Sequence, residues 1–85
     1  MPHIIVEYAF DHPMTDEEFD EMADRLGPCL DARNVRWVQS FLATDRKRRL
    51  CIFEAADAEA VRSAYRSARV GFERAWAADA ITDDD

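Results

Sequence analysis

The stretch "VRWVQSFLATDRKRRLCIFEA" (Val35 to Ala55) decides the fold, because it holds two strand-like runs separated by a short polar turn. The runs are Val35 to Ala43 and Arg48 to Ala55, and residues of their β-branched and aromatic kind favour strands. Because only "TDRK" separates them, the two runs are expected to form a β-hairpin. Four consecutive basic residues, Arg46 to Arg49, then lie at the hairpin tip and at the start of its second strand.

The sequence before the hairpin predicts a strand followed by a helix. The strand is His3 to Phe10, which ends at the turn-forming Asp11-His12-Pro13. Thr15 and Glu18 have the spacing of a capping box, which marks the start of a helix. Gly27-Pro28 is expected to end or kink that helix. Its apolar residues follow the i, i+3, i+4, i+7 spacing of an amphipathic helix: Phe19, Met22, Ala23 and Leu26.

The sequence after the hairpin predicts a second helix and a fourth strand. Asp57 is the expected N-cap of the helix, and Gly71 marks its exit. Phe72 to Ile81 is expected to form the strand, although alanine, a poor strand former, is frequent in it. The expected buried stripe of the second helix is Ala60, Val61, Ala64, Tyr65 and Ala68.

The predicted order of elements is β-α-β-β-α-β, which indicates an α+β, ferredoxin-like fold. We expect a four-stranded antiparallel sheet with both helices on one face. Residues 1–81 would form one domain, and residues 82–85 an acidic tail. The other sheet face would be uncovered, and a chain this small buries little surface alone, so a homodimer is expected.

The overall charge disfavours nucleic acid as a partner. Eighteen Asp and Glu against eleven Lys and Arg give a net charge of −7, whereas phosphate binding needs positive charge. No run approaches the roughly 20 apolar residues of a membrane span, and the first residues do not resemble a signal peptide. We therefore expect a cytoplasmic protein that binds neither nucleic acid nor membrane, with Cys29 and Cys51 reduced.

The segment "VRWVQSFLATDRKRRLCIFEAADAEAVRSAYRSA" (Val35 to Ala68) resembles the central part of a family of small bacterial ferredoxin-like proteins. This family is a domain of unknown function typified by a nickel-binding protein. The similarity begins with Val-Arg-Trp, a serine three residues further on, and a polar hairpin turn. A strand follows with the order aliphatic, Cys, aliphatic, aromatic, Glu, Ala. The next helix then begins with acidic residues and continues into Ala-Val-Arg. The opening "IIVEYAF" is similar to that family's first strand.

The resemblance implies a dimeric ferredoxin-like fold and, in some members, a bound divalent metal such as nickel. This chain has Gln39 and Ala64 at positions where the family often carries histidine. Nickel binding is therefore not carried over to this chain. The chain's own His3, His12, Cys29 and Cys51 show no CxxC, HxH or HxxxH spacing, which disfavours a transition-metal site. Nickel or another divalent metal stays an open alternative.

Two glutamates fall inside apolar strands, where an ionised carboxylate needs a partner. Glu7 lies in the first strand and Glu54 in the third, and these strands are neighbours in the expected sheet. One hypothesis brings the two together on the open face, where one would have a raised pKa and act as a general acid or base. The alternative is that arginines such as Arg36 or Arg74 hold them as structural ion pairs.

Strand alternation assigns the remaining candidates to sheet faces. On the third strand, Cys51 shares a face with Phe53 and Arg49, opposite Glu54. On the second strand, Trp37 is expected to share a face with Gln39, opposite Arg36 and its i+2 neighbours. A mid-strand cysteine is most simply a small buried hydrophobe, and strand aromatics are most often core or interface.

The leading functional hypothesis is a small dimeric protein that binds a metal ion or a small molecule. Its expected ligand-binding residues are Glu7, Trp37, Gln39, Cys51 and Glu54. Two alternatives stay open. One is a cofactor-free isomerase, cyclase or monooxygenase-like enzyme with a carboxylate in a cavity on the open sheet face, by analogy of fold. The other is a structural or regulatory interaction module.

Overall fold

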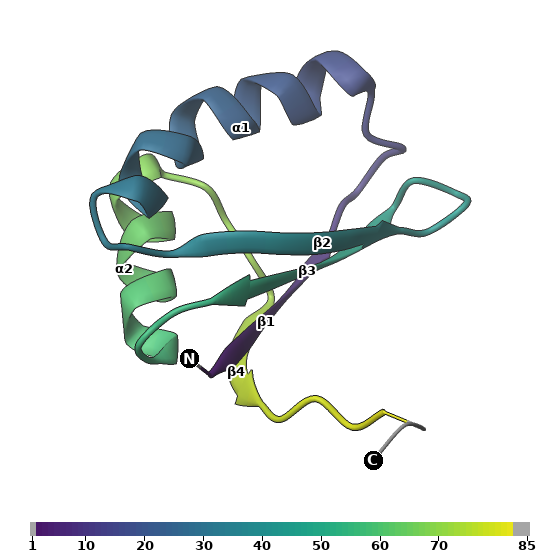
Figure 1. Ribbon diagram of the computed structural model, residues 1–85. Coiled ribbons are helices and arrows are strands. Elements are labelled where there is room, and N and C mark those ends of the chain that lie inside the picture. The colour runs from purple at the N-terminus through teal and green to yellow at the C-terminus, as the bar shows by residue number, and fades with distance from the viewer. Residues whose placement is uncertain (1, 83–85) are drawn as a thin grey trace.

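The computed structural model describes residues 2–82, and the elements follow the predicted order (Figure 1). Four strands form one antiparallel sheet in the spatial order β2-β3-β1-β4, with both helices on the same side. The expected ferredoxin-like arrangement is thus confirmed. The elements are β1 (His3–Ala9), α1 (Asp16–Asp31), β2 (Arg36–Leu42), β3 (Arg48–Glu54), α2 (Ala58–Ala68) and β4 (Arg74–Ala78).

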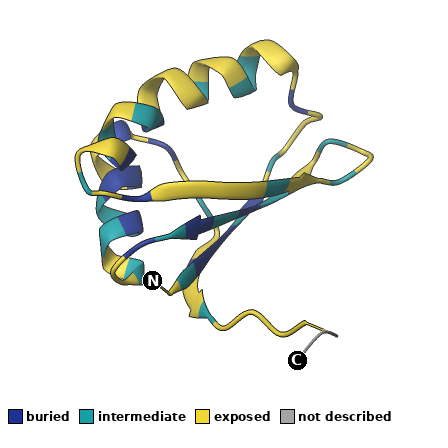
Figure 2. Ribbon diagram, viewed as in Figure 1, coloured by how far each residue is buried: buried dark blue, intermediate teal, exposed yellow. Residues whose placement is uncertain are grey.

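The hydrophobic core lies between α2 and the inner faces of β1 and β3 (Figure 2). The stripe predicted for α2 is buried except at its first residue, Ala60, which is half-buried. Asp57 caps this helix as predicted, its carboxylate accepting from the Ala60 N–H at 2.8 Å. The main residues of the core are Ile4, Val6, Tyr8, Cys51, Phe53, Val61, Ala64, Tyr65 and Ala68.

Helix α1 is held less tightly, because only Leu26 and Leu30 of its sixteen residues are buried. It packs chiefly against α2 and lies above β2 without covering it, as Figure 1 shows. As a result β2 is exposed along nearly its whole length. None of the helices in residues 2–82 is long and apolar enough to cross a membrane.

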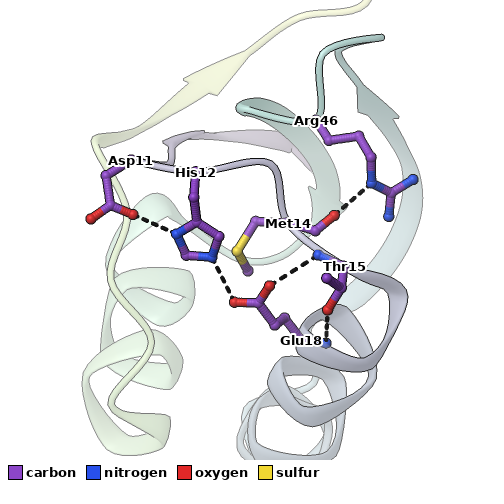
Figure 3. Close-up of polar contacts among 6 residues, drawn as sticks. All are labelled: Asp11, His12, Met14, Thr15, Glu18 and Arg46. Atoms are coloured by element: carbon purple, nitrogen blue, oxygen red, sulfur yellow. Dashed lines mark hydrogen bonds and ion pairs between the residues drawn. The ribbon is translucent and has the colours of Figure 1, made fainter.

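The predicted capping box begins α1 as expected (Figure 3). The Thr15 hydroxyl accepts from the Glu18 N–H at 3.2 Å, and the Glu18 carboxylate accepts from the Thr15 N–H at 3.0 Å. The same carboxylate lies 2.8 Å from His12 Nε2, while Asp11 lies 2.6 Å from His12 Nδ1. Arg46 at the hairpin tip binds the Met14 carbonyl oxygen and reaches Asp16 at 2.7 Å. The hairpin tip and the helix start are therefore tied together.

Gly27 and Pro28 do not end α1, which continues to Asp31. Proline removes one helical hydrogen bond, and its ring crowds the Cβ of the residue before it. Gly27 has no Cβ, so it is the residue that best tolerates a helical conformation before Pro28. Of the two effects expected of Gly27-Pro28, an end or a kink, the end was wrong, because Cys29 and Leu30 add a further turn to α1.

The pairing of β2 with β3 shifts by one residue between Trp37 and Gln39. This β-bulge reverses the side-chain alternation of every later residue in the strand. Gln39 pairs with Ile52 on the open face, whereas Trp37 and Ser40 both lie on the helix side, beside Phe53 and Cys51. The expected sharing of one face by Trp37 and Gln39 was therefore wrong.

Strand β4 is shorter than predicted, because it spans Arg74–Ala78 and not the whole of Phe72 to Ile81. Phe72 precedes the strand and packs against the core. Ile81 is exposed beyond its end. Residue 82 belongs to no element, and residues 83–85 of the predicted acidic tail lie outside the described residues.

A buried hydrogen bond between the Tyr8 and Tyr65 hydroxyls crosses the core. In the Tyr65→Phe variant the Tyr8 hydroxyl keeps its burial but loses its partner, so we expect a loss of about 1–3 kcal/mol in the free energy of unfolding. The Tyr8→Phe/Tyr65→Phe double variant should lose less than the sum of the two single variants, because no unpaired hydroxyl remains. Urea denaturation of the four proteins tests this, and additive losses would contradict it.

The His12–Glu18 contact makes stability depend on pH. Hydrogen bonds to Glu18 and Asp11 raise the pKa of His12 above its ordinary 6.5, so its stabilisation is complete below about pH 6.5 and is lost as pH rises through the folded-state pKa. The hydrogen bond from His12 lowers the pKa of Glu18 below its ordinary 4.5. The stabilisation from Glu18 is therefore present above about pH 4.5 and is lost as pH falls through the folded-state pKa.

We expect His12→Gln to reduce the free energy of unfolding more at about pH 5.5 than at about pH 8.5. At the lower pH the stabilisation from His12 and the stabilisation from Glu18 are both present. Chemical denaturation at both pH values measures the difference. In a Glu18→Gln background, the effect of His12→Gln should depend less on pH. An equal effect at both pH values in the otherwise unchanged protein would show that the contact does not form.

Candidate functional site

Glu7 and Glu54 lie on the same open face of the sheet but at opposite ends of the β1–β3 pair. Glu7 pairs with Leu50, and Glu54 pairs with His3. The two strands run antiparallel, so a residue near the end of one strand faces the beginning of the other. The hypothesis that the two carboxylates meet was therefore wrong.

Each of these carboxylates instead forms an ion pair with its own arginine. Glu54 forms an ion pair with Arg36, which lowers the pKa of the carboxyl, and His3 Nε2 lies 4.0 Å away. Glu7 lies 3.3 Å from Arg74 Nε and accepts from the Trp76 indole N–H at 2.8 Å. The alternative of structural ion pairs, with Arg36 and Arg74 as partners, is confirmed.

The other side of the sheet contains an apolar crevice between α1 and the strands β2 and β3. Its volume is about 350 Å³. Two of the residues expected to bind ligand, Trp37 and Cys51, line it, whereas Glu7, Gln39 and Glu54 lie on the opposite face. Its lining residues are Tyr8, Met22, Ala23, Leu26, Gly27, Leu30, Trp37, Arg49, Cys51, Phe53 and Tyr65.

Ser40 is the polar centre beside this crevice. Its hydroxyl accepts from the Trp37 indole N–H and donates to Cys51 Sγ, each at 2.9 Å. Arg49 Nη2 also approaches this hydroxyl, at 3.4 Å. The bulge produces this arrangement, because it brings Trp37 and Ser40 to the same face of β2. The side chain of Trp37 is thereby held at the crevice while 55% of the residue stays exposed.

Cys51 is a buried thiol and not an activated nucleophile. Burial raises the pKa of its thiol, and the Ser40 hydrogen bond and the Arg49 charge oppose that rise only in part. A thiol of raised pKa stays protonated at neutral pH, and the thiolate is the reactive form. The lining of the crevice contains no histidine, aspartate or glutamate that would act as a base.

Arg49 enters the crevice from β3, where it pairs with Tyr8 of β1 and Leu42 of β2. Its guanidinium carbon lies 4.9 Å from the Phe19 ring centre and 5.8 Å from the Tyr8 ring centre. Arg49 Nη1 lies 4.0 Å from Met22 Sδ. The cation therefore lies against two aromatic rings and a thioether, which are weakly polar neighbours for a full charge, and the residue is partly exposed.

The residues present do not fit a resident nickel ion. Within residues 2–82, no three side chains of His, Cys, Asp or Glu come together as a metal would require. Gln39 lies on the open face and Ala64 is buried in α2 on the helix side. The two positions where the family often has histidine are therefore separated by the sheet in this chain.

Sequence reasoning singled out neither Ser40 nor Arg49 as a site residue. The signal for Arg49 was its alternation with Cys51 and Phe53, which places it on the buried face despite its position in the basic run. No comparable signal marked Ser40, because the bulge that turns it toward Cys51 is accompanied by no glycine or proline.

Comparisons with known proteins agree with this fold. A family model described as "Nickel responsive protein SCO4226-like" matches residues 4–78. The crystal structure of SCO4226 from Streptomyces coelicolor A3(2) superposes with a TM-score of 0.81 and 16% sequence identity, covering 94% of this chain and 99% of that one. No protein with a curated description matches the sequence. At this identity the structural likeness shows the shared fold, and the match over residues 4–78 shows that the chain belongs to the nickel-responsive SCO4226-like family.

Proposed function

We propose that this protein binds a small organic molecule in the crevice between α1 and the sheet. The observation that carries the proposal is the crevice itself, whose volume of about 350 Å³ falls within the roughly 300–1,000 Å³ of ligand pockets. Like most such pockets, it combines apolar walls with a few fixed polar groups. Cys51 and Arg49 are polar groups in its lining, and Ser40 beside the crevice contacts both of them.

Packing considerations support a binding site over an accidental gap. Protein interiors are close-packed, and a helix that leaves an apolar space beneath it loses both contacts and burial. Here α1 has room to approach, because an added Cβ at Gly27 would meet no atom within 4 Å outside its chain neighbours and its own helix. The bulge also holds Trp37 beside the space by a hydrogen bond to Ser40. A ligand between α1 and β2 would restore the missing contacts.

The chemistry of the crevice favours binding over turnover. Its lining offers no general base, and burial keeps the Cys51 thiol protonated. Both carboxylates considered for the enzymatic alternative are paired with an arginine, Glu7 with Arg74 and Glu54 with Arg36, and Arg36 lowers the pKa of Glu54. The family description names a nickel-responsive protein, but the described residues bring no three metal-ligating side chains together. An organic ligand therefore fits this chain better than a metal ion.

We further propose that a second copy of the chain covers the open sheet face. Phe41 and Trp76 are exposed there by 55% and 43%, and Ile52 lies half-buried between them. Exposed apolar surface of this kind marks an interaction site. The ion pairs Glu7–Arg74 and Glu54–Arg36 flank it, and such paired charges are a common rim for an interface. The crevice lies on the other side of the sheet, so dimerisation would leave it open.

The Ile52→Glu variant tests the dimer. A carboxylate buried without a partner at the interface should weaken association by more than about a hundredfold. Light scattering after size-exclusion chromatography at micromolar concentration would then give a dimer for the unchanged protein and a monomer for Ile52→Glu. Leu42→Glu is the matched control, because Leu42 is an apolar residue of the neighbouring strand that faces the helix side. A monomeric unchanged protein, or equal effects of both variants, would contradict the proposal.

Fluorescence of Trp37 tests the crevice. In a Trp76→Phe background Trp37 is the only tryptophan, so its emission reports binding of naphthalene-2-carboxamide, a small neutral probe. Ala23→Phe should weaken that binding at least about tenfold, because the new ring fills the crevice that Ala23 lines. Ala32→Phe is the control, since Ala32 is an exposed residue at the end of α1 that does not line the crevice. Absence of any binding, or equal weakening by both variants, would refute the assignment.

A further inference from the structure

We infer that the ligand of the crevice is an organic anion, with an apolar body beneath α1 and its charged group bound by Arg49. This inference rests on the proposed function, because it specifies the ligand class of the same crevice. It is carried by the unneutralised charge of Arg49, by the surplus of donors on its guanidinium, and by the polarity of the crevice along its length.

Arg49 differs from the other arginines in how its charge is met. Arg36, Arg46 and Arg74 each reach a carboxylate. In residues 2–82, no carboxylate oxygen lies within 4.0 Å of Arg49. Arg48 and Arg69 also have none among these residues, but both are exposed to solvent. Arg49 is partly buried, so water solvates its charge less well.

The guanidinium of Arg49 also has donors to spare. Its two contacts are long, one to Ser40 Oγ at 3.4 Å and one to Met22 Sδ at 4.0 Å. Arg33 is the useful comparison, because it too has no carboxylate partner among the described residues but forms three hydrogen bonds of 2.8 to 3.0 Å. A guanidinium carries five N–H donors in a planar fork that matches a carboxylate. Among the described residues, no short hydrogen bond occupies that fork in Arg49.

The crevice is charged toward one end and apolar toward the other. Arg49 lies beside Phe19 and Met22, in the first half of α1. Leu30 lines the crevice in the last turn of that helix, together with Phe53 and Trp37 of the sheet. A molecule that lies along the crevice would therefore meet a cation at one end and hydrocarbon and aromatic surface at the other. That pattern selects a small amphipathic molecule.

The sign of the selected charge follows from the donors. Arginine donates and cannot accept, and no acidic side chain lines the crevice. A cationic ligand would be repelled by Arg49 without compensation, whereas a carboxylate accepts two parallel N–H bonds from the fork. The cation on Arg49 would also be neutralised on binding, in a site where few polar groups solvate it. Monoanionic organic acids with an apolar body are thus the ligand class.

The experiment compares two probes of the same shape, naphthalene-2-carboxylate and naphthalene-2-carboxamide, by calorimetric titration of the intact protein at neutral pH. We expect the acid to bind about ten- to a hundredfold more tightly than the amide, as a charge-assisted hydrogen bond in a partly buried site requires. Arg49→Met should weaken binding of the acid much more than binding of the amide, so that the preference disappears. Arg49→Lys should keep part of it, because the charge remains but the fork is lost.

The outcomes separate this inference from the proposed function. Equal affinities of acid and amide in the unchanged protein would overturn the anion inference and leave the crevice intact as a binding site. If Arg49→Met weakened both probes equally, Arg49 would be a support for α1 and the inference would fall. Failure of both probes to bind would overturn the crevice as well. Circular dichroism of each variant confirms that it is folded before its titration is interpreted.

Discussion

Burial of α2 against the inner faces of β1 and β3 is the constraint on which the rest of the molecule depends. Val61, Ala64, Tyr65 and Ala68 present one continuous stripe to the sheet, and Tyr65 carries the hydrogen bond to Tyr8 across it. A domain of this size has one core to build, and here α2 with the two central strands forms most of it. The edge strands and α1 contribute little to this core, so their positions are less constrained by packing.

The crevice is a consequence of that division of roles. Because α1 buries only Leu26 and Leu30, it can stand away from β2 without exposing the main core. The bulge in β2 then turns Trp37 and Ser40 toward the open space, and Arg49 enters it from β3. Three neighbouring strands and both helices thus line a space that none of them fills. The two faces of the sheet also have separate roles, with paired charges on one and an unneutralised arginine on the other.

The order of elements could be predicted because each boundary is set by local chemistry. The capping box at Thr15 and the cap at Asp57 act over three or four residues, so they can be recognised from the sequence alone. The helix-covered face of β1 could be predicted because no bulge interrupts the pairing of β1 with β3 or β4. The strands' neighbours followed from the handedness of crossovers.

The site was harder to predict because it depends on register and direction. Glu7 and Glu54 are separated by the antiparallel direction of their strands, and that direction was already implied by the predicted fold. The bulge at Trp37 depends on how β2 meets its neighbour, which no local signal records. Pro28 misled for a different reason, because the preceding Gly27 relieves the clash that normally stops a helix. Arg46, in the basic run, contacts Met14 and Asp16 at the start of α1, and this contact depends on how the hairpin tip packs against the helix.

The bulge in β2 has a consequence beyond the crevice. β2 is an outer strand of the sheet, and its apolar residues Trp37, Val38, Phe41 and Leu42 are exposed. A flat outer strand of this composition would be a template for edge-to-edge growth between molecules, with each chain adding its strand to the next. The extra residue breaks the regular spacing of hydrogen-bonding groups and twists the strand. The irregularity thus discourages the sheet from extending into fibrous aggregates, while the apolar side chains stay available for selective contacts.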